Sequence, residues 1–331
     1  MASARGLRQV AWFDCPGGGQ VVVDGRTAYI AHMKAPHGTS VVDVADPKAP
    51  RQIAALEVPA GTHSHKVRAA NGLMLVNREA HPADQARGLE AGLLIFDVTT
   101  PSAPRQLAFW KSGGAGVHRF TFDGRYAYIS PEMDGFVGNI MLILDIEDMG
   151  KPTLVSGLDW SPPFITPTHT ALPVPFPLQG RRVLLVADED VAKLQPGPPS
   201  FLWLVDITDE KKPVPFASFQ VDGVDGSPQP EFTGCHQPCE EVRGTEIPVA
   251  WFAHGLRVVD IANPHAPREV ASFVPDAAGG RTATTSAVGV VSRNRLTASW
   301  ALTASRTHAP QYCRISRRTS RCRGLSSTRR T

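Results

Sequence analysis

Short apolar runs recur along the chain and are separated by polar turn residues. The clearest runs end in an aspartate and lead into a polar turn: SVVDVADPKAPRQ, LLIFDVTTPSAPRQ, MLILDIEDMGKPT, LWLVDITDEKKPV and LRVVDIANPHAPRE. Their aspartates are Asp43, Asp97, Asp145, Asp206 and Asp260, at steps of 54, 48, 61 and 54 residues. Apolar runs bounded by turn residues indicate β-strands, and their regular recurrence indicates an internal repeat.

A tight-turn signal lies ahead of the first three runs. The dipeptides Asp24-Gly25, Asn71-Gly72 and Asp123-Gly124 favour primed turns between antiparallel strands. We therefore expect an inner hairpin in each unit, in which the start of the first strand lies beside the end of the second. A repeat of about 40 to 50 residues suits the four-stranded blade of a β-propeller.

The five copies resemble the LVIVD-repeat β-propeller family over roughly residues 7–279. The resemblance implies an all-β propeller of four-stranded blades and implies no single activity. A six-bladed ring needs one more blade in addition to these five copies and the short apolar strand at 7–13. We expect residues 1–279 to form the propeller, and residues 280–331 to form an irregular tail in place of a degenerate or replaced last blade.

The tail differs sharply from the rest in charge. It contains eleven arginines and no lysine, aspartate or glutamate, which leaves 23 basic and 31 acidic residues elsewhere. The acidic balance of the propeller makes nucleic acid an unlikely partner. The tail is either a disordered basic arm or an out-of-frame or unrelated sequence where the sixth blade should be, and its position favours the second interpretation. A strand remains possible in SAVGVV or LTASWAL.

Histidine occupies the same position in four consecutive units. The residues that start the first strand of each hairpin are Gln20, His65, His118, His169 and His236. The first strand of a propeller blade is the innermost, so these side chains should converge on the central channel. Neutral imidazole binds transition metals, and the sequence therefore predicts one metal ion on the four histidines. Fe or Cu is favoured, and Zn, Mn and Ni are possible.

Acidic and further histidine residues recur where the second strand ends. These residues are His32, Glu79, Glu132, Glu189 and His254. Each glutamate is expected beside a histidine, where it could orient the imidazole, ligate the metal or act as a general base. His32 and His254 are expected to complete the ring at that level. Gln20, His63, Arg78 and Arg119 are expected to line the pocket.

Two other interpretations of the histidines remain open. Repeat duplication can copy a structural histidine that bonds a backbone group in each blade. Three histidines can also hold a metal with an open position while the fourth lines the pocket. The arrangement is similar to that of the carotenoid-cleavage oxygenases and of the methanethiol oxidase and selenium-binding proteins, although their sequence motifs do not match here.

The sequence favours a metal-dependent enzyme that acts on a small organic molecule, with oxidation slightly preferred and Glu79, Glu132 and Glu189 as catalytic groups. The alternatives are a hydrolase or lyase that uses metal-bound water, and a non-catalytic scaffold with a structural ladder of histidine and glutamate. Five cysteines form no disulfide framework. We expect a cytoplasmic protein without a membrane span, and the oligomeric state is not predicted.

Overall fold

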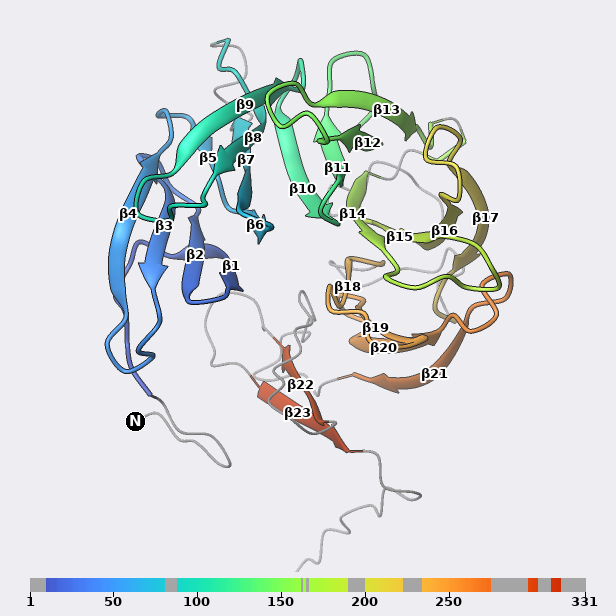
Figure 1. Ribbon diagram of the computed structural model, residues 1–331. Coiled ribbons are helices and arrows are strands. Elements are labelled where there is room, and N and C mark those ends of the chain that lie inside the picture. The colour runs from blue at the N-terminus through green and yellow to red at the C-terminus, as the bar shows by residue number, and fades with distance from the viewer. Residues whose placement is uncertain are drawn as a thin grey trace, which may run out of the picture.

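In the computed structural model, the described residues are 10–80, 88–161, 163–164, 167–189, 200–222, 234–274, 297–302 and 311–316. All regular elements in this part of the chain are β-strands. Five antiparallel blades are arranged around a common centre (Figure 1), and the innermost strands are β1, β6, β10, β14 and β18. The region between these inner strands is called the channel below. The prediction of an all-β propeller with four-stranded blades is confirmed.

Strands follow one another outwards from the channel in each blade. The first blade consists of β1 (Gly18–Asp24), β2 (Thr27–His32), β3 (His37–Asp43) and β4 (Arg51–Glu57). The second consists of β6 (Val67–Ala70), β7 (Leu73–Ala80), β8 (Gly92–Asp97) and β9 (Arg105–Lys111), with the short β5 (Thr62–His63) beside the end of β7.

The remaining blades repeat this plan. The third consists of β10 (Gly116–Phe122), β11 (Tyr126–Glu132), β12 (Met141–Asp145) and β13 (Thr153–Leu158). The fourth consists of β14 (Thr168–Pro173), β15 (Val183–Asp188), β16 (Leu202–Asp206) and β17 (Val214–Phe219). The fifth consists of β18 (Gln237–Pro238), β19 (Glu246–Ala250), β20 (Leu256–Asp260) and β21 (Arg268–Phe273).

The repeated aspartate closes the turn after the third strand of every blade. Its carboxylate accepts a hydrogen bond from the backbone N–H two residues later, at 2.8–3.0 Å, in an Asx-turn. Each of these carboxylates also pairs with an arginine; the pairs are Asp43–Arg51, Asp97–Arg105, Asp145–Arg125, Asp206–Arg181 and Asp260–Arg268. The aspartate of the repeat therefore stabilises the turn that returns the chain to the outer strand.

Apolar faces of neighbouring blades form the core. Separate buried clusters lie between blades 1 and 2, 2 and 3, 3 and 4, and 4 and 5; representative pairs are Val41 and Met74, Leu93 and Ile129, Tyr128 and Leu184, and Leu204 and Trp251. Because each face is buried only against the next blade, the ring holds its inner strands in fixed positions around the channel.

Between the first and fifth blades, the described part of the chain contains no further four-stranded blade. In Figure 1 the hairpin of β22 (Thr297–Leu302) and β23 (Gln311–Ser316) is drawn between β1 and β21. On β1, Val21 and Val23 are 56% and 60% exposed, so this face of the first blade is not buried as the other blade faces are. The LTASWAL candidate falls on β22, while SAVGVV lies outside the described residues. The division into propeller and tail stays a prediction.

Nothing in the described part of the chain is a helix with the length and apolar character that a membrane crossing needs.

Candidate metal centre

The four histidines predicted to bind metal lie side by side. His118 lies on β10 and His169 on β14, while His65 precedes β6 and His236 precedes β18. Their ring centroids are separated by 5.4 Å between His65 and His118, 5.1 Å between His118 and His169, and 4.3 Å between His169 and His236. The repeat therefore places one imidazole from each of four blades in a continuous row at the channel.

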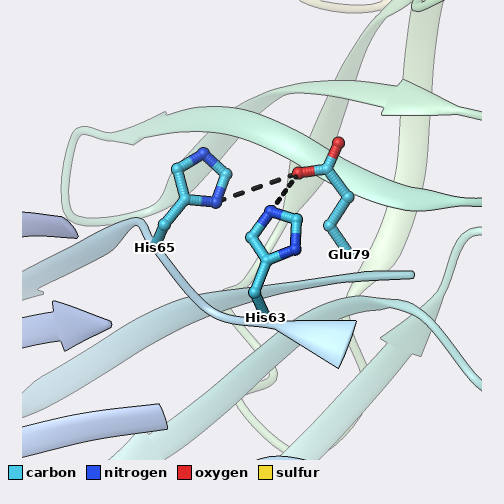
Figure 2. A group of neighbouring side chains, drawn as sticks. All are labelled: His63, His65 and Glu79. Carbon is cyan, nitrogen blue, oxygen red and sulfur yellow. Dashed lines mark ion pairs between the residues drawn. The ribbon is translucent and has the colours of Figure 1, made fainter. Parts of the chain in front are cut away.

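Glu79 is surrounded by three imidazoles. Its Oε2 lies 3.0 Å from His63 Nε2 and 3.8 Å from His65 Nδ1 (Figure 2), and its Oε1 lies 3.1 Å from His118 Nδ1. Strand pairing sets this position, because Glu79 is opposite His63 of β5 and opposite Gly116 of β10. Glu79 therefore contacts the histidine of its own blade and that of the next.

Glu189 has the corresponding position between the fourth and fifth blades. It directly follows β15, and its carboxylate lies 3.7 Å from His169 Nε2 and 3.3 Å from His236 Nε2. His118, His169 and Glu189 form a group in which each residue offers one donor atom, and these atoms lie within 4.8 Å of one another. His63, His65 and Glu79 form a second such group.

The two carboxylates differ in their affinity for protons. Burial alone would raise the pKa of Glu79, but hydrogen bonds from His118 and His63 outweigh burial and hold this pKa well below its usual value. At Glu189 burial prevails over the attraction of His118 and Arg119, and the pKa is raised. Glu79 is therefore the fixed anion of the site, and Glu189 is the better proton acceptor of the two carboxylates.

Two of the buried imidazoles are held neutral. Burial, with the nearby charge of Lys66, lowers the pKa of His65 to about 2. Burial, with the neighbouring His236, lowers the pKa of His169 well below its usual value. An uncharged ring keeps a nitrogen lone pair at neutral pH, which is the form that ligates metal ions.

Asn77 fixes the tautomer of His65. Its amide oxygen accepts a hydrogen bond from the Lys66 N–H at 2.8 Å, and its amide nitrogen donates to the Val117 carbonyl at 2.9 Å. This orientation places the amide nitrogen 3.3 Å from His65 Nδ1, so Nδ1 accepts a hydrogen bond and the ring proton lies on Nε2. Nδ1, which faces Glu79, therefore carries the lone pair.

Three further residues expected at the level of the ring are His32, His254 and Glu132. His32 is buried, with Nε2 2.8 Å from Ser40 Oγ on the next strand outwards. His254 lies in the turn that links β19 to β20, because β19 already ends at Ala250. Glu132 is opposite Gly116, as Glu79 is, and lines a cavity of about 470 Å³. Burial and the negative charge of Glu79 raise the pKa of Glu132, while the nearby His118 opposes this rise. The expectation that His32 and His254 complete the ring stays a prediction.

The other residues expected in the pocket divide between two places. Arg119 and Gln20 extend to Glu240, which also pairs with Arg68 at 2.6 Å. Through Arg119 this ion cluster also acts on the metal site, because the Arg119 charge opposes the rise of the Glu189 pKa and helps to lower the pKa of His169. Arg78 points away from the site, with its guanidinium over the ring of Phe109 at 4.9 Å. His63, expected only to line the pocket, is a direct partner of Glu79.

Two contributors to the site were not predicted from the sequence. Glu240 has no counterpart in the aligned positions of the other repeats, and its pairing with Arg68 and Arg119 depends on the closeness of three blades. Phe252 packs on the His236 ring at 4.6 Å with an interplanar angle of 27°. Its φ of 39° is unusual for a bulky residue, and the AWFAH string gives no sign of it.

Comparison with protein families gives a match to the LVIVD repeat over residues 248–274. The match covers the outer hairpin of the fifth blade and bears out the resemblance seen in the sequence. No curated protein sequence matches the chain.

Solved structures share the fold at low sequence identity. Sqt1 of Saccharomyces cerevisiae is 9% identical with a TM-score of 0.57, over 87% of this chain and 71% of its own. The periplasmic gluconolactonase PpgL of Pseudomonas aeruginosa is 12% identical with a TM-score of 0.57, over 88% and 82%. A hypothetical selenium-binding protein of Sulfolobus tokodaii is 12% identical with a TM-score of 0.53, over 77% and 61%. These similarities concern the fold alone.

Proposed function

We propose that this LVIVD-repeat β-propeller is a metal-dependent enzyme that acts on a small organic molecule. The observation that carries the proposal is the row of imidazoles from four blades with two buried carboxylates against it. A purely structural histidine needs one backbone or side-chain partner, whereas here neutral rings and carboxylate oxygens converge in groups within 4.8 Å. Such convergence suits metal ligands better than a structural ladder.

The donor set fits a transition metal. Imidazole nitrogen is a ligand of intermediate softness and suits Fe, Cu, Ni and Zn, whereas Mg and Ca prefer oxygen ligands. His65, His118, His169 and His236 would hold the ion with the adjacent carboxylates, and Fe or Cu remains the preferred identity. A redox-active metal would supply electron transfer to or from the substrate, which supports oxidation as the leading reaction class.

Two carboxylates of the site, Glu79 and Glu189, would perform different tasks beside the metal. Glu79 stays ionised and accepts the hydrogen bond of His118 Nδ1 at 3.1 Å, so it holds that ring in one orientation. Glu189 has a raised pKa and lies against His169 and His236, so it is placed to take up or release a proton beside the metal ligands. Glu132 lines a neighbouring cavity, and burial with the charge of Glu79 raises its pKa beside His118.

A hydrolytic reaction is the second candidate, and the raised pKa of Glu189 favours it. A carboxylate with a raised pKa is a stronger base and can accept a proton from water. A bound metal would lower the pKa of that water. The reaction class is then decided by the metal, with Zn or Mn directing the site to hydrolysis or elimination.

The state of the described cysteines supports the expected cytoplasmic location. Cys15, Cys235 and Cys239 are free thiols, and the last two are buried. Burial raises the pKa of the Cys239 thiol to about 11, so it is a poor nucleophile and a poor disulfide partner. Free buried thiols suit a reducing compartment.

Oxygen consumption would test the leading proposal. The Fe- or Cu-loaded protein is expected to consume oxygen with at least one member of a panel of small alcohols, aldehydes and thiols. Glu189→Gln should reduce the rate at least 100-fold, because it removes the carboxylate that would carry the proton. His265→Ala, at an exposed imidazole that packs on Phe216, serves as the matched control. Equal rates in the Glu189→Gln variant and the wild type would contradict the role given to Glu189.

A further inference from the structure

The donor atoms of the channel form two groups in the described part of the chain, where the sequence predicts one. The first group contains His63, His65 and Glu79, and the second contains His118, His169 and Glu189. His63 and Glu79 come together because β5 pairs with the end of β7. The repeat supplies His65 and His118 in equivalent positions, but β5 adds a second imidazole to the first group.

Distances within the first group suit one ion. Ligands of a tetrahedral ion with bonds of about 2.1 Å lie about 3.4 Å apart. Glu79 Oε2 is 3.0 Å from His63 Nε2 and 3.8 Å from His65 Nδ1, on either side of this value. Figure 2 shows both rings directed at the same oxygen. The Asn77 hydrogen bond keeps a lone pair on His65 Nδ1, so this nitrogen can bind without losing a proton.

In the second group, two nitrogen–oxygen distances fall in the same range. His169 Nε2 is 3.7 Å from Glu189 Oε2, and the other nitrogen of that ring lies 2.8 Å from Thr170 Oγ1. His236 Nε2 is 3.3 Å from the second oxygen of Glu189, which makes it a further candidate ligand. The second group thus contains ligands for an ion of its own.

Glu79 links the two groups. Its Oε2 belongs to the first group, while its Oε1 lies 3.1 Å from Nδ1 of His118, a member of the second. The His118 Nδ1–H donates to this carboxylate and leaves Nε2 available as a ligand, the arrangement by which carboxylates orient metal-binding histidines. A change at one group is therefore transmitted to the other through one side chain.

We infer that the channel binds two transition-metal ions, one on His63, His65 and Glu79 and the other on His118, His169 and Glu189. The inference rests on the proposed function, since it concerns the same site. Two adjacent ions are a known arrangement for activating water or oxygen-containing substrates from both sides. The pair would take a substrate with an oxygen atom or carboxylate that can contact both.

Isothermal titration calorimetry measures the number of ions directly. The full-length, metal-free protein is titrated with Zn²⁺ or Co²⁺. Two ions per folded chain are expected. His63→Gln should bind one, because it removes a ligand from the first group alone. His169→Gln should also bind one, and His37→Gln, at a histidine outside both groups, should bind two. Circular dichroism establishes that each variant is folded.

One ion per wild-type chain would overturn the two-ion inference and leave the metal-dependent proposal standing. No ion on a folded wild-type chain would overturn both. Two ions on folded His63→Gln would overturn the assignment of the first group. The wild-type stoichiometry decides between one ion and two even if neither site variant folds.

Discussion

Single side chains at this channel acquire properties that their residue types do not predict. Glu79 and Glu189 end or follow equivalent strands, yet hydrogen bonds from histidines lower the pKa of Glu79 while burial raises that of Glu189. The sequence shows that both are placed beside histidines. It does not show which histidines, because the contacts of Glu79 depend on pairing of β7 with both β5 and β10.

Glu240 gives a pH-dependent contribution to stability. Despite burial, Arg119 and Arg68 lower its pKa to about 2. The contribution is therefore fully present above the ordinary glutamate pKa of about 4.5 and is lost as the pH falls through that range towards 2. Its size is on the order of 3 kcal/mol.

The measurement is the free energy of unfolding in urea from pH 6 to pH 3. The wild type should lose stability more steeply than Glu240→Gln across this interval, because the variant has no carboxylate to protonate. Glu241→Gln, at an exposed neighbour, is the matched control and should follow the wild type. Parallel curves for the wild type and Glu240→Gln would contradict the pairing of Glu240 with the two arginines.

At the level of the elements, the sequence predicts the repeated parts well. The apolar runs that end in aspartate correspond to the third strands, from β3 to β20, and the Asx-turn explains why aspartate recurs there. The irregular parts could not be predicted. The two-residue strand β5 is too short to give a periodic pattern, and it is the element that brings His63 to Glu79. The AWFAH string predicts a strand that ends at His254, four residues after the observed end of β19 at Ala250. The strand ends earlier because the chain turns at Trp251.

Asp206 allows the turn to be tested in one blade. Its Oδ1 accepts the Thr208 N–H at 2.9 Å, and its Oδ2 pairs with Arg181. Asp206→Ala should lower the free energy of unfolding by about 1–2 kcal/mol, because it removes both interactions. Asp206→Asn keeps the acceptor of the turn and should lose less than half as much. Urea denaturation measures both, and an equal loss in the two variants would show that the ion pair, not the turn, carries the effect.

For the whole molecule, four blade interfaces are buried and the first blade has a face that is not. Val21 and Val23 on β1 are more than half exposed, whereas Val67 on the inner strand of the next blade is fully buried. This contrast is expected for a face that no neighbouring blade covers in the described part of the chain. In the sequence the last aspartate-ended repeat is followed by the arginine-rich residues 280–331, and the expectation that these residues stand in place of a last blade stays a prediction. The histidine row lies on the second to fifth blades, so His236 belongs to a blade beside this face.

The central claim is that the imidazoles of these blades hold transition metal, and the metal content of the purified protein tests it most directly. The protein is produced without a histidine tag and measured by inductively coupled plasma mass spectrometry, with circular dichroism to establish folding. The account predicts at least one equivalent of Fe, Cu or another transition metal, and at most half of that content in His118→Ala. A folded wild-type protein that holds no metal, even after incubation with Fe²⁺, Cu²⁺ and Zn²⁺, would contradict the account.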